Sequence, residues 1–395
     1  MGAGDPAEPI PAFLYPVPPM DERLLAERLI TYDTSTLDGL RAAAGFVKGW
    51  LGSRDIEVTD REHEGLPVIL AEVGAPEGAG VPTVVFHGHL DVVPGHPEQF
   101  EPRVEGDRLV GRGAYDMKGA LAAMMCSLRD VAEQRQVRVR FMCVPDEEAD
   151  DVDERSTDAL VRAGDVGDFA ITGEPTDLHI GVQAKGVLAF RMLVIGRAAH
   201  GSTPWLGDNA VLKALDAFRA IESLPFSRQS SELFDRPSIN LARVLGGDAL
   251  NKVPDACVID VDIRYLPEQD PGDILADIRA IPDVEVVKTF IRPPVLVSPR
   301  DPHVVALREA VGGLAGGDVL SVGRDGASDA HSFVDAGIPA VEFGPRGGGH
   351  HGPEEWVSLS SLAGYREALR RFVHGLPASL ARGGRLRAVG GDEAS

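Results

Sequence analysis

Several classes of protein are excluded by features that this sequence lacks. No apolar run reaches the roughly 18 residues that a membrane-spanning helix requires, and the first 20 residues contain none of the Lys or Arg that a secretory signal peptide carries. The three cysteines, Cys126, Cys143 and Cys257, are odd in number and lie in apolar surroundings, which is typical of buried thiols rather than of a disulfide framework. We therefore expect a cytoplasmic protein.

Positive charge is scarce as well. The 395 residues include 39 Lys and Arg against 61 Asp and Glu, which gives a formal net charge of −22 at pH 7. Such a charge repels nucleic acids and anionic membranes, so neither is expected as a partner. The surplus of carboxylates is compatible instead with the binding of cations.

Three common catalytic or cofactor motifs are missing. The sequence has no Gly-x-Ser-x-Gly turn and no His-Glu-x-x-His segment, which disfavours a serine hydrolase and a zincin protease. Residues 347–352 formally fit Gly-x-Gly-x-x-Gly, but Pro353 follows and no helix begins there, so dinucleotide binding is not expected.

The order of apolar patterns predicts an α/β fold. Strand-like and helical segments alternate at first, which favours a mostly parallel sheet flanked by helices. After Lys185-Gly186 the order becomes β-α-β-β-α-β, which is ferredoxin-like. The predicted strands are 67–73, 83–87, 137–144, 169–172, 187–195, 238–245, 257–265, 284–291 and 338–343, and the predicted helices are 21–31, 36–53, 119–133, 209–223, 271–281, 302–315 and 360–374.

These segments predict a domain inserted into a larger one. Residues 1–186 and 293–379 would form the two parts of the main domain, and residues 187–292 a ferredoxin-like lid. Residues 1–19 are expected to be an irregular arm, and the tail 380–395, which contains Gly and Arg, to be disordered.

Five polar clusters are expected at one edge of the predicted sheet. Four of them directly follow a strand-like run, and the fifth precedes a helix. Ligands of an open α/β sheet bind at the carboxyl ends of its strands, so these clusters are candidates for one site. They are His89 with Asp91, Asp116, Asp146-Glu147-Glu148, Glu174, and His350-His351.

The residue types in the clusters are those of a two-metal hydrolase. Two metals about 3.5–4 Å apart need a shared carboxylate, and two histidines with three or four carboxylates suit two zinc ions with one acid to spare. His89 would be a ligand, and Asp91 would fix its imidazole tautomer.

Two pairs of neighbours leave alternatives open. Glu147 and Glu148 point different ways along the chain, so one can bind metal while the other faces the substrate as a base. Either His350 or His351 could be the second histidine ligand by chemistry alone, and the register with Glu355 favours His351.

The ordered set of motifs resembles the di-zinc amidohydrolases and exopeptidases, a family that includes succinyl-diaminopimelate desuccinylase, acetylornithine deacetylase, aminoacylase and glutamate carboxypeptidase. The matching stretches lie between residues 21 and 375. They are His89-Leu-Asp-Val-Val-Pro, Gly111-Arg-Gly-Ala-Tyr-Asp-Met-Lys-Gly, Asp146-Glu-Glu, Gly173-Glu-Pro-Thr, Ala199-His-Gly-Ser-Thr-Pro, Asn251-Lys-Val-Pro and Ser328-Asp329.

The resemblance implies a role for each residue of the metal centre. Two zinc ions per chain are expected, for which Co²⁺ could substitute. Glu147 would be the general base, and a cis peptide bond would join Asp116 to Met117. His89 and Glu174 would bind one ion, Glu148 and His351 the other, and Asp116 would bridge them.

The resemblance also implies a homodimer formed through the lid. His200 would stabilise the oxyanion, either in its own chain or in the partner subunit. Asn251 and Arg264 would hold the carboxylate of the substrate, and Ser328 would contact it as well.

Two positions depart from the family pattern. A glycine usually follows soon after Asp-Glu-Glu in the family, whereas here Ala149 and an acidic run over 150–154 follow. His331 stands where many relatives have arginine, and it could contact the substrate or be structural. His87, on the same strand face as His89, is interpreted as structural.

The predicted function is metal-dependent hydrolysis of an amide bond in a small N-acyl amino acid, of the acetylornithine or succinyl-diaminopimelate type. The alternative within the family is a dipeptidase or carboxypeptidase. A non-catalytic metal-binding protein on the same fold is a remote alternative. The sequence does not decide which acyl group or which amino acid is used.

Overall fold

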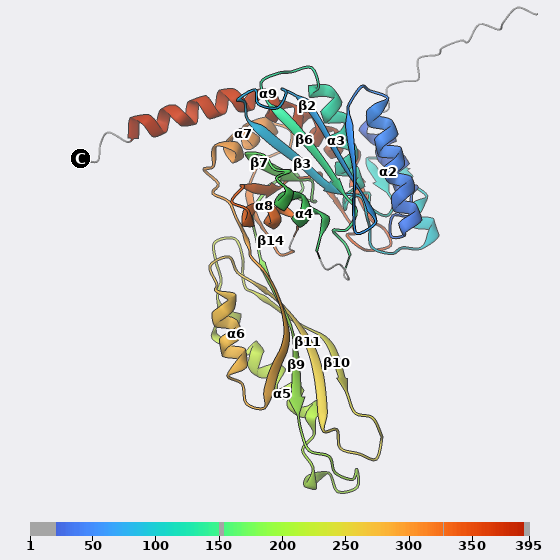
Figure 1. The fold of residues 1–395 in the computed structure, drawn as a ribbon, viewed down its shortest axis with the longest axis vertical. Helices are drawn as coiled ribbons and strands as arrows, with labels where there is room; N and C mark the ends of the chain where they lie inside the picture. Colours follow the sequence, from blue (N-terminus) through green and yellow to red (C-terminus); the bar gives the residue numbers. More distant parts are fainter. Residues whose placement is uncertain (1–20, 150–153, 327, 391–395) are drawn as a thin grey trace, which may run out of the picture.

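The computed structural model describes residues 21–149, 154–326 and 328–390, with side chains as far as residue 381. It shows an α/β main body and an elongated arm of four strands and two helices that extends from one side of it (Figure 1). The irregular segment predicted over 1–19 lies outside the described residues.

The main body is built on a nine-stranded sheet in the order β1-β2-β6-β3-β7-β15-β8-β13, with β14 paired to β8. The four central strands β6, β3, β7 and β15 are parallel. β1, β2, β8 and β13 join them through antiparallel pairs, and β14 pairs parallel with β8. The predicted mostly parallel sheet is therefore confirmed. The strands are β1 (Val58–His63), β2 (Leu66–Gly74), β3 (Thr83–His89), β6 (Arg138–Val144), β7 (Phe169–Thr172), β8 (Ile180–Ala184), β13 (Val295–Leu296), β14 (Ser321–Arg324) and β15 (Ala340–Glu342).

Helices cover both faces of this sheet. α3 (Lys118–Val131) packs against α1 (Glu22–Ile30) and α9 (Leu359–Gly390), and α9 also contacts α7 (Pro302–Val311). α4 (Ser156–Ala163) packs against α8 (Ala330–Asp335).

Side chains on β3 show that these two groups of helices lie on opposite faces. Gly88 lies under Met117 and Leu121 at the start of α3, whereas the ring of His87 packs on Phe333 of α8. Successive residues of a strand point to opposite faces. A strand buried from both sides explains the continuous apolar run before His87.

Local caps fix where the first helices begin. The Asp21 side chain accepts the N–H of Leu24 at the start of α1, and Thr36 accepts that of Gly39 at the start of α2 (Leu37–Gly52). Both helices begin within one residue of their predicted positions.

A second, small sheet joins two of the polar clusters. Its order is β16-β17-β5-β4, and all of its pairs are antiparallel. Strands β16 (Gly347–Gly348) and β17 (Trp356–Ser358) flank the His350-His351 loop, and β5 (Arg108–Val110) precedes the Asp116 loop; β4 is Arg103–Glu105. The small sheet therefore brings these two loops together.

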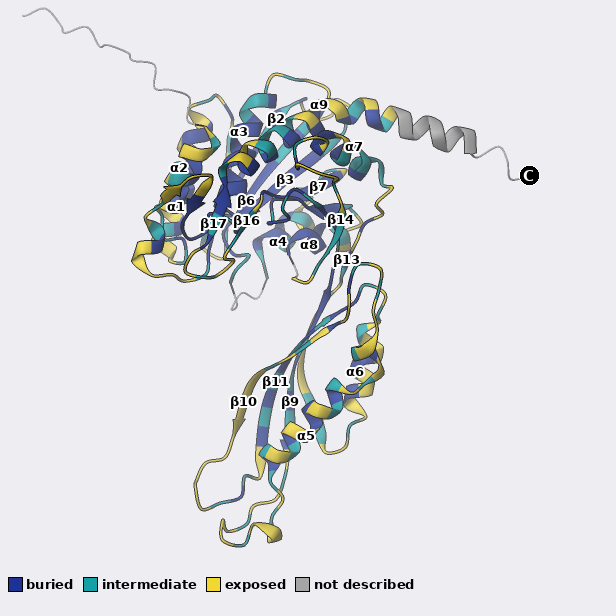
Figure 2. Ribbon diagram, turned by 180° about the vertical axis from the view of Figure 1, so that it is seen from behind, coloured by how far each residue is buried: buried dark blue, intermediate teal, exposed yellow. Residues whose placement is uncertain are grey.

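The lid has the predicted β-α-β-β-α-β order: β9 (Gly186–Ile195), α5 (Ala210–Glu222), β10 (Ser238–Gly246), β11 (Ala256–Tyr265), α6 (Pro271–Arg279) and β12 (Val284–Arg292). Its antiparallel sheet has the order β10-β11-β9-β12, and both helices lie on one side of the strands (Figure 2). The inward side chains of β9, such as Leu188 and Met192, form with α5 and α6 a hydrophobic core separate from that of the main body.

The structure continues helix α9 into residues 380–390, for which the sequence predicted a disordered tail. Helix α9 continues to Gly390 and passes Pro377 without ending. Leu, Ala and Arg, which are strong helix formers, account for seven of these eleven residues. Residues 391–395 lie outside the described part of the chain. Among the described residues, no helix combines the length and apolarity needed to cross a bilayer.

Candidate metal centre

His89 ends β3 and is buried. Its Nε2 lies 3.0 Å from Asp116 Oδ1 and 3.8 Å from Glu174 Oε1. Its Nδ1 lies 3.0 Å from the backbone oxygen of Asp91 and 3.5 Å from the carboxylate of the same residue. An N–H on Nδ1 that donates to Asp91 would direct Nε2 to the acids.

The Asp91 carboxylate has a further task that the sequence did not indicate. Its two oxygens accept the backbone N–H groups of Glu147, at 3.2 Å, and of Glu148, at 2.8 Å. Asp91 therefore fixes the turn that presents both acids, while its carbonyl is the nearer partner of His89.

The loop that carries Asp116 is held by a buried acid, Glu355. Its Oε1 accepts the N–H groups of Tyr115, at 2.9 Å, and Asp116, at 3.0 Å. Its Oε2 accepts the N–H of Gly113 and an Arg112 guanidinium N–H, both at 2.9 Å. All four bonds converge on one side chain, so Glu355 sets the position of Asp116.

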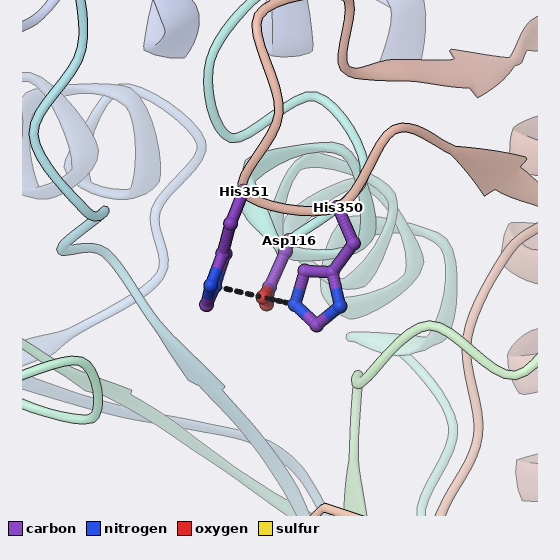
Figure 3. A group of neighbouring side chains, drawn as sticks. All are labelled: Asp116, His350 and His351. Atoms are coloured by element: carbon purple, nitrogen blue, oxygen red, sulfur yellow. Dashed lines mark hydrogen bonds and ion pairs between the residues drawn. The ribbon is translucent and has the colours of Figure 1, made fainter. Parts of the chain in front are cut away.

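Asp116 lies between the two adjacent histidines (Figure 3). The His350 Nε2 is hydrogen-bonded to Asp116 Oδ2, and the His351 Nε2 lies 3.3 Å from the same oxygen and 2.8 Å from Glu148 Oε1. Because its other oxygen faces His89, Asp116 has the geometry of a bridging carboxylate. The bond to Glu148 favours His351 as the partner ligand, although His350 is also within reach. The Asp116–Met117 peptide bond is cis.

The possible metal-binding atoms form three groups that share residues. Within each group, all of these atoms lie within 4.8 Å of one another. Donors of one tetrahedral zinc, each about 2.1 Å from the ion, lie about 3.4 Å apart. The spacing therefore fits metal ions. One group is the predicted set of His89, Asp116 and Glu174, whereas the other two also contain His350 and Glu147, which were not predicted as ligands. The groups are His89–Asp116–Glu174, Asp116–His350–His351 and His89–Glu147–Glu148.

The electrostatics of the cluster also fit cations. Burial raises the pKa of Glu147, and the charge of Glu174 raises it further. Burial and the charge of Asp116 act on the pKa of Glu174 in the same direction. The His351 pKa is raised to about 9, chiefly by its hydrogen bond to Asp116. Grouped carboxylates that repel one another in a buried site are stabilised when a divalent cation lies among them.

A cavity of about 380 Å³ opens onto these donors between the main body and the lid. Its size suits a small molecule. Four arginines line it: Arg155, Arg264, Arg292 and Arg324. Five carboxylates line the same cavity, so its wall carries both signs of charge: Asp116, Glu147, Glu148, Glu174 and Glu342.

Three of these arginines were not among the residues predicted from the sequence. Arg155 lies 3.1 Å from Glu147 Oε1, and Arg324 donates from Nε to Glu342 Oε2 at 2.7 Å. Arg292 and Arg324 each end a strand, β12 and β14. That strand-end position was the only available signal, and it does not distinguish them from surface cations.

The predicted substrate residues separate into two groups. Arg264 and Ser328 line the cavity, although the Ser328 hydroxyl donates to Glu342 at 2.7 Å and Arg264 Nε donates to Asp262 at 3.1 Å. His200 and Asn251 instead lie together at the far tip of the lid, where the Gly201 N–H donates to the Asn251 carbonyl at 2.7 Å.

His87 and His331, two histidines near the site that were not predicted as metal ligands, are both buried. His87 Nε2 lies 2.9 Å from Thr157 Oγ1 and 3.3 Å from Asp329. His331 lines the cavity, and its Nε2 lies 3.0 Å from an Arg292 nitrogen. Burial, with the charge of Arg292, lowers the His331 pKa to about 4, so its neutral ring accepts this bond.

Comparison with known proteins identifies the family to which this fold and site belong. A model of peptidase family M20/M25/M40 matches residues 85–375. The chain belongs to this family. It is 29% identical over 310 residues to a succinyl-diaminopimelate desuccinylase of Hahella chejuensis, which covers 73% of this chain and 80% of the relative. It is 32% identical over 308 residues to a putative succinyl-diaminopimelate desuccinylase of Mycobacterium tuberculosis, covering 74% and 82%.

Solved structures share the M20/M25/M40 fold. An aminopeptidase from Bacillus cereus and an M20 family metallo-carboxypeptidase from Sulfolobus solfataricus each give a TM-score of 0.73 at 19% identity, covering 90% of this chain and 99% of theirs. The resemblance read from the motifs is confirmed. The protein is a metal-dependent hydrolase of amide bonds.

Proposed function

We propose that this M20/M25/M40 protein hydrolyses the amide bond of N-acyl amino acids, with two zinc ions per chain and Glu147 as general base. The observation that carries the proposal is the position of Asp116. One of its oxygens faces His89 and the other faces His350 and His351, and Glu147 lines the same cavity.

The contacts of the side chains support an assignment of the ligands. His89 and Glu174 would hold one ion, Glu148 and His351 the second, and Asp116 both. Bound metal ions lower the pKa of water and polarise a carbonyl. The Glu147 carboxylate would take the proton of the attacking water and return it to the leaving nitrogen. The Asp91 carboxylate positions Glu147 because it accepts the backbone N–H of Glu147.

The arginines that line the cavity support an anionic substrate. Arg264 would bind the α-carboxylate of the amino acid as a bidentate pair. The two sequence relatives quoted above are named as desuccinylases, and their names favour an N-acyl amino acid over a dipeptide.

The test is a hydrolysis assay of the zinc-loaded and cobalt-loaded protein. We expect turnover of N-succinyl or N-acetyl amino acids, little turnover of N-acyl amines that lack the carboxylate, and about two metal ions per chain by elemental analysis. Glu147→Gln should lower turnover by roughly 10²–10⁴ with its metal content unchanged.

Three results would contradict parts of this proposal. A preference for dipeptides would make the protein a peptidase. Equal turnover of amides without a carboxylate would remove the role of Arg264. Near-complete activity of Glu147→Gln would exclude Glu147 as the base.

A further inference from the structure

The lid sheet has one face that its own helices leave uncovered. α5 and α6 pack on the side that carries Leu188 and Met192 of β9, and both lie on one side of the strands (Figure 2). The alternate side chains therefore form an open face next to the cavity of the metal centre.

The strand register arranges this open face in rows. The row nearest the main body is Arg292, Val187, Arg264 and Ser238; the second is Phe290, Ala189, Asp262 and Asn240; the third is Lys288, Arg191, Asp260 and Arg243. A fourth row, of Glu285, Leu193, Val258 and Leu245, lies beyond the third. Rows two residues apart along a strand are separated by about 6.6 Å, so the first and third rows lie about 13 Å apart.

This face continues the cavity of the metal centre. A second cavity, of about 500 Å³, lies over the open face, and five residues line both cavities: Arg155, Val187, Arg264, Phe290 and Arg292. The two cavities are therefore adjacent, and a molecule bound at Arg264 can extend from the first into the second along the lid.

Lys288 differs from the other cations of this face in its contacts with the described residues: its charge helps to lower the pKa of Asp260, but it makes no direct bond. Arg191 binds Asp260 through two bonds, of 2.7 and 2.9 Å, and Arg292 is held by Asp158 at 2.9 Å. Within the described residues, exposed Lys288 forms no hydrogen bond or ion pair.

An apolar surface separates Lys288 from the first row. Phe290 lies between Lys288 and Arg292 on β12, and it is 49% exposed. Ala189 is its cross-strand neighbour on β9. A cation, an exposed aromatic ring and a second cation in a line suit a molecule with an aliphatic middle and an anionic group at each end.

We propose that the open face of the lid is an extended subsite that binds the remote, negatively charged end of an elongated substrate, with Phe290 against its aliphatic part and Lys288 at its terminal anion. This inference rests on the proposed function for the group bound at Arg264. It adds that the substrate reaches about 13 Å beyond that anchor.

The test uses binding, so that it does not depend on turnover. Zinc-loaded protein is titrated calorimetrically with straight-chain α,ω-dicarboxylates of 4 to about 16 carbons and with monocarboxylates of equal length. Dodecanedioate extends over about 14 Å, from C–C bonds of about 1.5 Å. We expect affinity to rise about threefold to tenfold once the diacid spans the two rows, relative to the matched monoacid.

Variants separate the subsite from general electrostatics. Lys288→Ala should abolish the gain, Lys288→Glu should reverse it, and Lys288→Arg should restore it. Arg279→Ala, which removes the same charge from α6 on the covered side, should leave the gain unchanged. The subsite is refuted by a diacid affinity without a length dependence, by an unaltered gain in Lys288→Ala, or by an equal loss in Arg279→Ala. Hydrolysis of short N-acyl amino acids by the same variants reports separately on the proposed function.

Discussion

Single buried residues decide the geometry of the metal centre, and Glu355 illustrates this best. It has no place in the proposed chemistry, yet it accepts three backbone N–H groups and one guanidinium N–H around Asp116. A carboxylate can accept from both sides at once, which an amide cannot. The ion pair between Glu355 and Arg112 is almost completely buried.

Replacing Glu355 with glutamine should therefore damage both stability and metal binding. The amide would point its NH₂ at one pair of donors and leave Arg112 buried without its counter-charge. We expect the free energy of unfolding to fall by about 3–5 kcal/mol and zinc affinity to fall about 10–100-fold, measured by urea unfolding and by zinc titration.

The neighbouring residue provides the control. The Glu354 side chain is 75% exposed and pairs with exposed Arg103 at 3.2 Å. Glu354→Gln should change the free energy of unfolding by no more than about 1 kcal/mol and should not alter zinc binding. Equal effects of the two substitutions would show that Glu355 does not position the loop.

Whether the sequence alone predicts that a residue lies in the site depends on how the residue reaches it. His89 and Glu174 follow apolar strands, and the edge of a parallel sheet brings such residues together, so the sequence alone predicts that they lie close. Glu355 and Arg292 reach the site from a turn and from the lid. Their contacts depend on packing between distant segments, which no local pattern contains.

At the scale of elements, segments with a clear apolar pattern were predictable, whereas elements without one, such as β1, β16 and β17, were not. The nine predicted strands and seven predicted helices all correspond to observed elements. Strands β16 and β17, of 2 and 3 residues, are too short to show a period. Their hairpin carries His350 and His351. The strand before this loop predicted that the two histidines lie at the sheet edge, whereas the pairing of the hairpin with β5 could not be predicted.

A second prediction concerns the close packing of α3 against the loop that carries Asp116. A Cβ on Gly119 in the first turn of α3 would lie 2.4 Å from the carbonyl oxygen of Ala114. Gly119→Ala should lower the free energy of unfolding by about 1–3 kcal/mol and weaken metal binding, because backbone that precedes Asp116 must shift.

Gly45 in α2 is the matched control for helix propensity. A Cβ at this exposed position meets nothing within 4 Å. Gly45→Ala should raise the free energy of unfolding by up to about 1 kcal/mol with zinc affinity unchanged. Chemical denaturation and zinc titration of both variants check the pair. A stabilised Gly119→Ala with intact metal binding would contradict the steric argument.

On the scale of the whole molecule, the length of the lid separates two predicted parts of the active site. Arg264 lies at the end of β11 nearest the main body, whereas His200 and Asn251 lie beyond the far ends of β9 and β10. The 10 residues of β9 span about 30 Å. His200 therefore does not reach the metal centre of its own chain in this arrangement.

Apolar side chains around the same tip favour a partner chain. Trp205 is 74% exposed, and Leu206 and Leu245 are exposed as well. Exposed large apolar groups that lie close together are typical of an interface. We propose that the lid forms a homodimer and that His200 acts in the active site of the partner subunit.

Mixing two inactive variants tests this proposal. His200→Ala should lose about 10²–10³ in turnover if the imidazole supports the oxyanion, and Glu147→Gln lacks the base. In a heterodimer of the two, one site combines an intact Glu147 with an intact His200 from the other chain. Co-expression should therefore restore about one quarter of wild-type activity, because half of a random mixture is heterodimer with one working site of two. If His200 serves its own chain, every site in the mixture lacks one group and activity stays at the level of the separate variants. Sedimentation of the mixture must also show dimers, since a monomer at micromolar concentration leaves no route for exchange between chains.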